Sequence, residues 1–82
     1  MNAFSERETK IIKILGRKKL RIKDIAEELF KDEPNTLDAE TKVSNSVIRI
    51  QKKCLSLDLP WTLEKTKDSQ ARFKTIRKVK LH

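Results

Sequence analysis

The residues most suited to chemistry lie between Ala39 and Leu55, in the stretch AETKVSNSVIRIQKKCL. Successive residues of an α-helix are about 100° apart around its axis, so a helix here would gather polar and positively charged side chains on one arc. That arc contains Lys42, Asn45, Ser46, Arg49, Lys52 and Lys53. No acidic residue occurs from Thr41 to Cys54, whereas ordinary solvent-facing helix surfaces mix charges of both signs. The arc therefore predicts binding to a negatively charged partner.

The opposite side of the same predicted helix is apolar. Its narrow arc consists of Val43, Val47, Ile50 and Cys54, with Ile48 and Leu55 widening it on one flank. We expect this side to pack inwards. Cys54 is the only cysteine, which excludes an internal disulfide and favours a reducing, cytoplasmic setting. We expect it to be a small core residue, because a redox-active thiol needs an exposed and electropositive environment.

Enzyme chemistry is difficult to place on this chain. The only histidine is His82, the last residue, so neither a histidine-paired nucleophile nor the usual zinc ligand set can be built. One glycine cannot form a phosphate-cradling loop, and the carboxylates alternate with lysines on outer faces. The sequence predicts no catalytic site, no metal site and no cofactor.

Charge is distributed unevenly along the 82 residues, whose net charge is +8. Residues 1–40 carry nine basic and nine acidic residues, whereas residues 41–82 carry eleven basic residues against three acidic ones, so the second half holds the whole excess. This asymmetry is typical of a domain in which one half supports the structure and the other, basic half contacts a polyanion. Nucleic acid is the first expectation, followed by an anionic membrane surface or an acidic protein.

No apolar run is long enough to span a membrane, and the N-terminus does not resemble a signal peptide.

Two helices are predicted in the first half of the chain. Ser5 and Glu8 form a capping-box pattern, so the first helix should cover residues 6–15 and end at Gly16. The basic turn Arg17, Lys18, Lys19 and Arg21 could contact phosphate or be solvated. A short strand is predicted at residues 20–22, and a second helix at residues 23–30, where apolar residues recur at helical spacing.

Residues 31–38, KDEPNTLD, have the composition of a loop. Thr36 or Asp38 is a candidate N-cap for the helix that follows, predicted at residues 39–55. The acidic residues Asp32, Glu33 and Asp38 would repel a phosphate backbone. We therefore expect them to point away from nucleic acid, towards a protein partner.

A β-hairpin is predicted at residues 61–76. Trp61 to Lys65 and Ala71 to Thr75 each alternate apolar with polar residues, and a polar turn separates them. Trp61, Leu63 and Phe73 should face the core. After Thr75 the alternation is lost, which a bulge, a strand end or a short basic helix would each explain. The whole chain, residues 1–82, is expected to form one small α+β domain, mainly helical.

From about Ser5 to Val79, the chain resembles the winged helix-turn-helix family of DNA-binding domains. The resemblance lies in KDIAEELF as a support helix, TKVSNSVIRIQKK as the helix after it, and PWTLEK with ARFKTIRK as a hairpin. It implies that the third helix lies in the major groove and that the hairpin, the wing, contacts the backbone or minor groove. Lys42, Asn45, Ser46 and Arg49 then take recognition-helix positions, and Lys65, Lys67 and Arg72 take wing positions. Lys52 and Lys53 on the helix and Lys74 on the hairpin complete the candidate DNA-binding residues.

The function expected from these features is sequence-specific binding of double-stranded DNA by a transcriptional regulator or accessory factor. Long loops before the third helix occur in response-regulator-type winged helices, where they can meet the transcription machinery, and the loop at residues 31–38 is the candidate for that contact. Two alternatives stay open. The chain could be a winged-helix adaptor or inhibitor that binds an acidic protein, or it could bind RNA through the same basic face.

Overall fold

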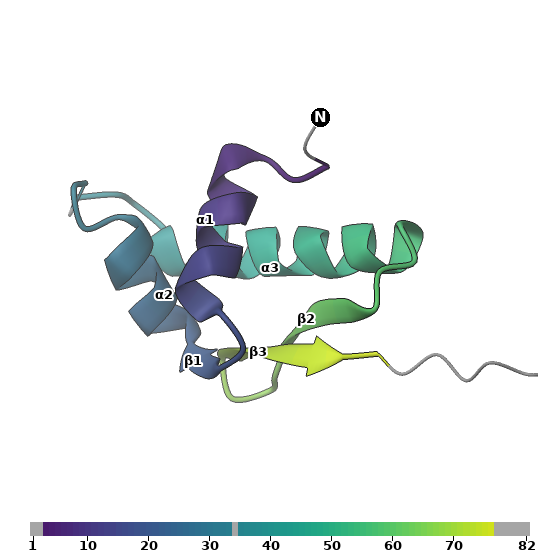
Figure 1. Cartoon of the computed structure of the whole chain (residues 1–82). Coiled ribbons are helices and arrows are strands. Elements are labelled where there is room, and N and C mark those ends of the chain that lie inside the picture. The colour runs from purple at the N-terminus through teal and green to yellow at the C-terminus, as the bar shows by residue number, and fades with distance from the viewer. Residues whose placement is uncertain (1–2, 34, 77–82) are drawn as a thin grey trace, which may run out of the picture.

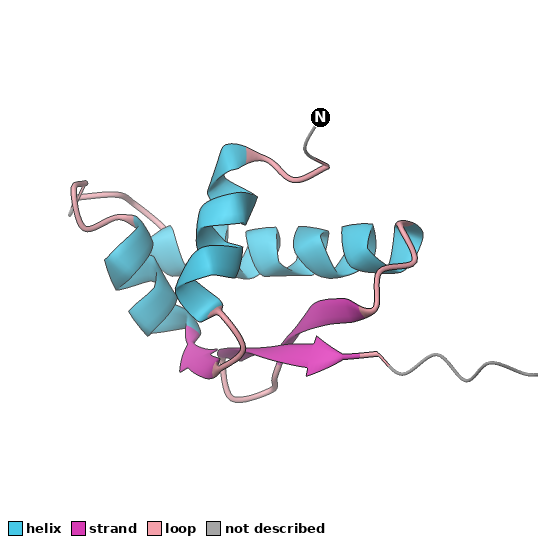
Figure 2. Ribbon diagram, in the orientation of Figure 1, coloured by secondary structure: helices cyan, strands magenta, loops and turns pink. Residues whose placement is uncertain are grey.

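The part of the chain that the structure describes folds into three helices and a three-stranded antiparallel sheet, which confirms the α+β class (Figures 1 and 2). The computed structural model describes residues 3–33 and 35–76. In chain order the elements are α1 (Glu6–Leu15), β1 (Lys19–Arg21), α2 (Ile22–Leu29), α3 (Ala39–Ser56), β2 (Trp61–Lys65) and β3 (Gln70–Thr75). Each predicted helix and strand is present, with bounds within one residue for the helices and the short strand.

The capping box predicted for α1 is formed. The backbone N–H of Ser5 donates to Oε1 of Glu8 at 2.7 Å, and the N–H of Glu8 donates to Oγ of Ser5 at 3.2 Å. At the other end, the N–H of Gly16 donates to the carbonyl of Ile12. Gly16 has a φ of 57°, a conformation that a residue without a Cβ adopts at little cost. The helix therefore begins and ends where its sequence predicts.

The predicted side-chain cap of α3 is wrong. Asp38 precedes the helix with a φ of 56° and a ψ of 36°, and its side chain makes no capping hydrogen bond. An N-cap residue normally has an extended backbone that directs its side chain at the first helical amides, and the left-handed conformation of Asp38 prevents this. The hydroxyl of Thr36 instead donates to the carbonyl of Glu33 at 2.7 Å.

In the sheet, β3 lies between β1 and β2. Leu20 pairs with Ala71 across β1 and β3, and Leu63 pairs with Phe73 across β2 and β3. Side chains alternate between the two faces of a strand, so these four residues share the face that packs on the helices. The alternatives for the segment after Ile76 fall outside the described residues.

The core confirms the inward side predicted for α3. Val43, Val47, Ile50 and Cys54 are fully buried together with Ile11, Leu15, Ile25 and Leu63. On the widening flank, Ile48 is half-buried, but Leu55 is 61% exposed, so its predicted burial is wrong. Trp61 and Phe73 pack against the core from partly buried positions.

Helix α3 is the element around which the others are arranged. In Figure 1, α1 crosses α3, and the sheet lies along α3, with β2 as the strand that contacts this helix. The hairpin turn reaches back to the start of α2, where the N–H of Ile22 donates to the carbonyl of Ser69 at 2.9 Å. The element order and the pairing of β1 with the hairpin are compatible with a winged-helix arrangement.

Candidate nucleic-acid interface

Four of the six candidate residues on α3 form an exposed surface. These are Lys42, Asn45, Arg49 and Lys52, here called the exposed arc. They project from the side of α3 opposite Val43, Val47 and Ile50, because the inward side is held by the core. The only acidic residue in the helix is Glu40 in its first turn. The exposed arc therefore presents three positive charges and one amide without a carboxylate between them.

Ser46 does not belong to this surface, and its predicted exposure is wrong. Only 4% of Ser46 is exposed. It lines a hollow with Ser5 and Glu8 of the α1 N-terminus, so α1 covers the flank of α3 on which Ser46 lies. We therefore remove Ser46 from the candidate DNA-binding residues.

Lys53 lies on the same flank of α3, which α1 covers. Its Nζ lies 2.6 Å from Oε1 of Glu8 and 5.9 Å from the centre of the Phe4 ring. The Lys53 side chain is 38% exposed, and that of Glu8 is 5% exposed. Its ammonium group is thus engaged by Glu8, and Lys53 is a weaker candidate for a phosphate contact than the exposed arc.

Glu8 stays ionised in this buried place because its hydrogen bonds outweigh its desolvation. Burial alone would raise its pKa, but hydrogen bonds from Lys53 and from the amide and hydroxyl of Ser5 lower the pKa of Glu8 below its usual value of 4.5. One carboxylate therefore caps α1 and anchors the C-terminal half of α3.

The flank of α3 next to Arg49 carries charges of both signs. Arg49 lines an open hollow of about 530 Å³ between α1, the end of α2 and the loop. Its lining includes the carboxylates of Glu6, Glu8, Asp32 and Glu33 and the cations of Arg7, Lys10 and Arg49. The sequence predicts that Asp32 and Glu33 point away from a bound nucleic acid. In the structure, both residues line this hollow beside Arg49 of α3. With four carboxylates against three cations, this side of Arg49 is less favourable for a phosphate backbone than the exposed arc, which has no carboxylate.

The opposite flank joins α3 to the hairpin. Asn45 of α3 and Lys65 of β2 line one hollow, together with Ile22, Glu40, Thr41, Ser44 and Ser69. Two residues that the sequence assigned to separate parts of the candidate site are therefore adjacent in the fold. This flank is continuous from the exposed arc to the hairpin turn.

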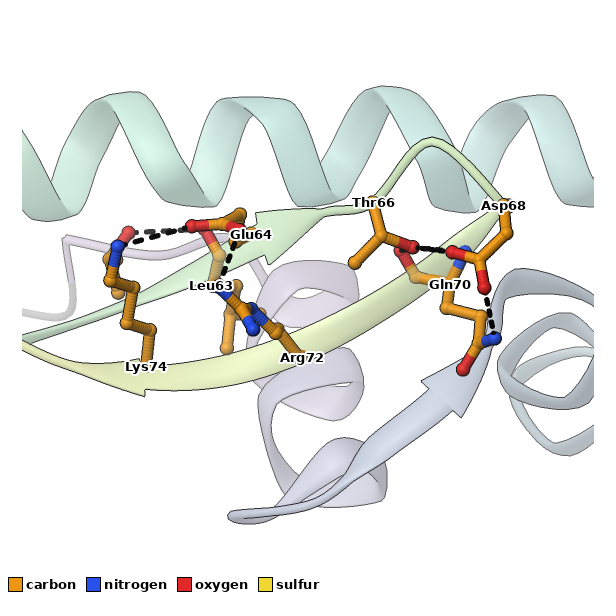
Figure 3. A network of polar contacts seen from close by, with 8 residues as sticks. Leu63, Glu64, Thr66, Asp68, Gln70, Arg72 and Lys74 are labelled. Carbon is orange, nitrogen blue, oxygen red and sulfur yellow. Dashed lines mark hydrogen bonds and ion pairs between the residues drawn. The ribbon is translucent and has the colours of Figure 1, made fainter.

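The hairpin turn that carries Lys67 is held by a side-chain network (Figure 3). The hydroxyl of Thr66 donates to Asp68, and the side-chain amide of Gln70 donates to Oδ2 of Asp68 at 2.7 Å. The hydrogen bond from Thr66 is the largest reason that the pKa of Asp68 lies below its usual value of 3.8. Lys67 is exposed at the tip of this turn.

The other basic hairpin residues share a carboxylate. Arg72 and Lys74 are neighbours of Glu64 across β2 and β3, on the face of the sheet turned away from α1 (Figure 3). Nη2 of Arg72 lies 2.9 Å from Oε1 of Glu64, and Nζ of Lys74 lies 3.5 Å from Oε2. Both cations were predicted from the sequence, but their common partner was not, because it depends on strand register.

Lys19 of β1 lies next to Arg72 on the side opposite Glu64. It pairs with Arg72 across β1 and β3. The sequence left the basic turn open between phosphate contact and solvation, and the register now places one of its lysines beside a predicted wing residue. Arg21, which also belongs to this basic turn, forms an ion pair with Asp24, with its Nε 2.8 Å from Oδ2.

Three aromatic rings form a row at the end of the sheet. The rings of Phe4 and Trp61 are 6.0 Å apart, and those of Trp61 and Phe73 are 5.9 Å apart and nearly parallel. Cations cover the two ends, with Lys53 over Phe4 and Arg17 over Phe73 at 5.8 Å. The ring faces are therefore engaged with each other and with cations.

Among residues 3–33 and 35–76, no helix is both long and apolar enough to cross a membrane. No three His, Cys, Asp or Glu side chains in the same part of the chain are grouped to hold a metal ion.

Comparison with known proteins gave no match: no family model fits the chain, and neither a curated protein nor a solved structure is significantly similar to it.

Proposed function

We propose that this chain binds double-stranded DNA as a winged helix-turn-helix domain and acts as a transcriptional regulator or accessory factor. The observation that carries the proposal is the exposed arc, Lys42, Asn45, Arg49 and Lys52, on an acid-free face of a helix that the core holds in place. A major groove admits one α-helix, and arginine and asparagine can each form paired hydrogen bonds with base edges.

We place the DNA in the proposed complex from the charges on and beside α3. The hollow on the α1 flank is lined by four carboxylates and three cations, whereas the hollow on the hairpin flank is lined by Glu40 and Lys65 and leads to the turn that carries Lys67. Neither hollow carries a strong net charge, so the cations of the exposed arc supply the main attraction for phosphates, and Lys65 and Lys67 extend it towards the hairpin. In the proposed complex the duplex therefore lies across the exposed arc and the hairpin.

The aromatic row disfavours RNA or single strands as the ligand. Single-strand and RNA-loop recognition uses open aromatic faces on which bases stack. Trp61 is stacked between Phe4 and Phe73, and the outer faces of the row meet cations. A base would have to displace one of these contacts in order to stack.

The loop after α2 is the surface that we propose for a protein of the transcription machinery. Leu37 is 81% exposed, and Asp32 and Glu33 are exposed in the same loop. An apolar side chain beside acidic groups suits a protein partner better than DNA.

Fluorescence anisotropy with three labelled ligands tests the proposal. A mixed-sequence DNA duplex, a DNA single strand and an RNA duplex of the same sequence should be titrated at two salt concentrations. We expect the tightest binding to duplex DNA, weakening steeply with salt because each neutralised phosphate adds about −0.9 to the slope of log affinity against log salt. Tighter binding to RNA or to the single strand would replace the proposal with the RNA alternative. Affinity for none of the three would favour an acidic protein partner.

A further inference from the structure

We infer that Glu64 acts as an internal competitor for a DNA phosphate at the sheet surface, and so sets the affinity of the proposed interface. This inference rests on the proposed DNA binding. It assigns a role to Glu64, an acidic residue of β2 on a surface where the other two strands of the sheet, β1 and β3, both contribute cations.

The geometry around Glu64 resembles a phosphate site occupied by a carboxylate. Each carboxylate oxygen contacts one cation, Oε1 with Arg72 at 2.9 Å and Oε2 with Lys74 at 3.5 Å. Guanidinium and ammonium groups bind phosphate oxygens by the same charge-assisted hydrogen bonds. The two oxygens of Glu64 therefore engage the cations that a backbone phosphate would need.

The position of Lys19 strengthens this interpretation. Lys19 and Glu64 both pair with Arg72, from opposite sides, so the three side chains form one row across the sheet. Like charges on directly opposed residues destabilise a sheet. Anions close by offset this repulsion: Glu64 pairs with Arg72, and the charge of Asp68 interacts with that of Lys19. A phosphate that displaced Glu64 would take over its part of this role.

The ion pairs are open enough to be displaced. The side chains of Glu64, Arg72 and Lys74 are 30%, 44% and 52% exposed. Half-exposed pairs of this kind contribute little to stability. A phosphate can therefore compete for Arg72 and Lys74, and the removal of the Glu64 charge should leave the fold intact.

The test is the substitution Glu64→Gln, which keeps the shape and removes the charge. The matched control is Glu28→Gln, because Glu28 also pairs with a lysine, Lys31 at 3.2 Å, but lies on α2. Affinity for a mixed-sequence duplex and for a selected site should be measured at several salt concentrations, with a melting curve for each variant.

We expect Glu64→Gln to steepen the salt slope by about 0.9, the value for one additional phosphate contact, which corresponds to about eightfold tighter binding near 0.1 M salt. The increase should be equal for both duplexes, since phosphate contacts do not report base sequence directly. Glu28→Gln should give a much smaller change. In an Arg72→Gln/Lys74→Gln background, Glu64→Gln should gain no more than the control.

Each outcome decides between the claims. Equal effects of Glu64→Gln and Glu28→Gln in a chain that binds duplex DNA would overturn the role of Glu64 and leave the proposed function standing. A chain that binds no duplex DNA with or without Glu64→Gln would overturn both. A gain that persists in the Arg72→Gln/Lys74→Gln background would show general charge repulsion and would also overturn the competitor role.

Discussion

Lys53 Nζ lies 2.6 Å from Glu8 Oε1, although 45 residues separate them in the chain. The same carboxylate oxygen accepts the N–H of Ser5, so the contact ties the N-terminus of α1 to the C-terminal half of α3. It also determines which side of α3 is covered. Ser46 and Lys53 are turned towards α1, and the exposed arc is left for a ligand.

The first prediction concerns the stability contributed by Glu8. Glu8→Gln should lower the free energy of unfolding by about 1 to 3 kcal/mol, because it weakens a capping box and leaves Lys53 without its anionic partner. The folded-state pKa of Glu8 lies below its unfolded value. Its charge therefore stabilises the fold above pH 4.5, and this contribution is lost as the pH falls below 4.5 towards the folded pKa.

Urea denaturation at several pH values between 3 and 7 provides the measurement. The difference between the parent and Glu8→Gln should shrink as the pH falls through that window. Glu6→Gln is the control, since Glu6 lies on the same helix with its side chain 89% exposed. A Glu8→Gln effect no larger than that of Glu6→Gln, or one independent of pH, would contradict the anchoring role.

Much of this arrangement was predictable from the sequence. Val43, Val47, Ile50 and Cys54 recur at helical spacing, so the inward side of α3 follows from local periodicity. The capping box of α1 is likewise a short-range pattern.

What the sequence did not predict depends on tertiary placement. Ser46 has a polar side chain and lies next to the exposed arc on the helix, and only the path of α1 across α3 buries it. The common partner of Arg72 and Lys74 depends on the register that places Glu64 opposite Arg72. A change of one residue in that register would move Glu64 to the other face of the sheet.

The second prediction concerns the core beneath α3. Val47→Ala and Ile50→Ala should each lower the free energy of unfolding by about 1 to 4 kcal/mol, because both side chains are fully buried and truncation leaves a cavity. A domain of this size has only about 4 to 12 kcal/mol in total. Thermal melting measures the loss, with Lys52→Ala on the exposed arc as the control. Melting curves like that of the parent for both core variants would show that α3 is rotated from its described position.

The third prediction concerns the tip of the hairpin. Lys67→Ala should weaken binding to every duplex by the same factor and reduce the salt slope by about 0.9, since a phosphate contact positions the protein without direct readout of bases. Lys13→Ala in the last turn of α1 is the control. Salt titrations on two unrelated duplexes give the comparison. Losses that differ between the duplexes would instead place Lys67 in a groove.

The fourth prediction concerns base recognition by Arg49. A guanidinium can donate to O6 and N7 of guanine together, which lysine cannot reproduce. Arg49→Ala should therefore cost about 1 to 3 kcal/mol on a selected site and relax preference at one base pair. Arg49→Lys should lose the same preference while keeping most of the affinity for a scrambled duplex. If both variants keep the parent's ratio of affinities for the selected and scrambled sites, Arg49 contacts only phosphate.

The measurement that tests the central claim most directly compares two double variants of equal charge. Lys42→Gln/Lys52→Gln removes two cations from the exposed arc. Lys13→Gln/Lys31→Gln removes two from a hollow lined by α1, α2 and the start of the following loop. Duplex affinity should be measured for both variants and the parent across a salt series.

We expect the arc variant to lose about 1.8 units of salt slope, near 0.9 for each lost phosphate contact, and most of its affinity near physiological salt. The control variant should bind almost as the parent does. Equal losses in the two variants would contradict the account, because duplex affinity would then follow net charge and not the exposed arc of α3.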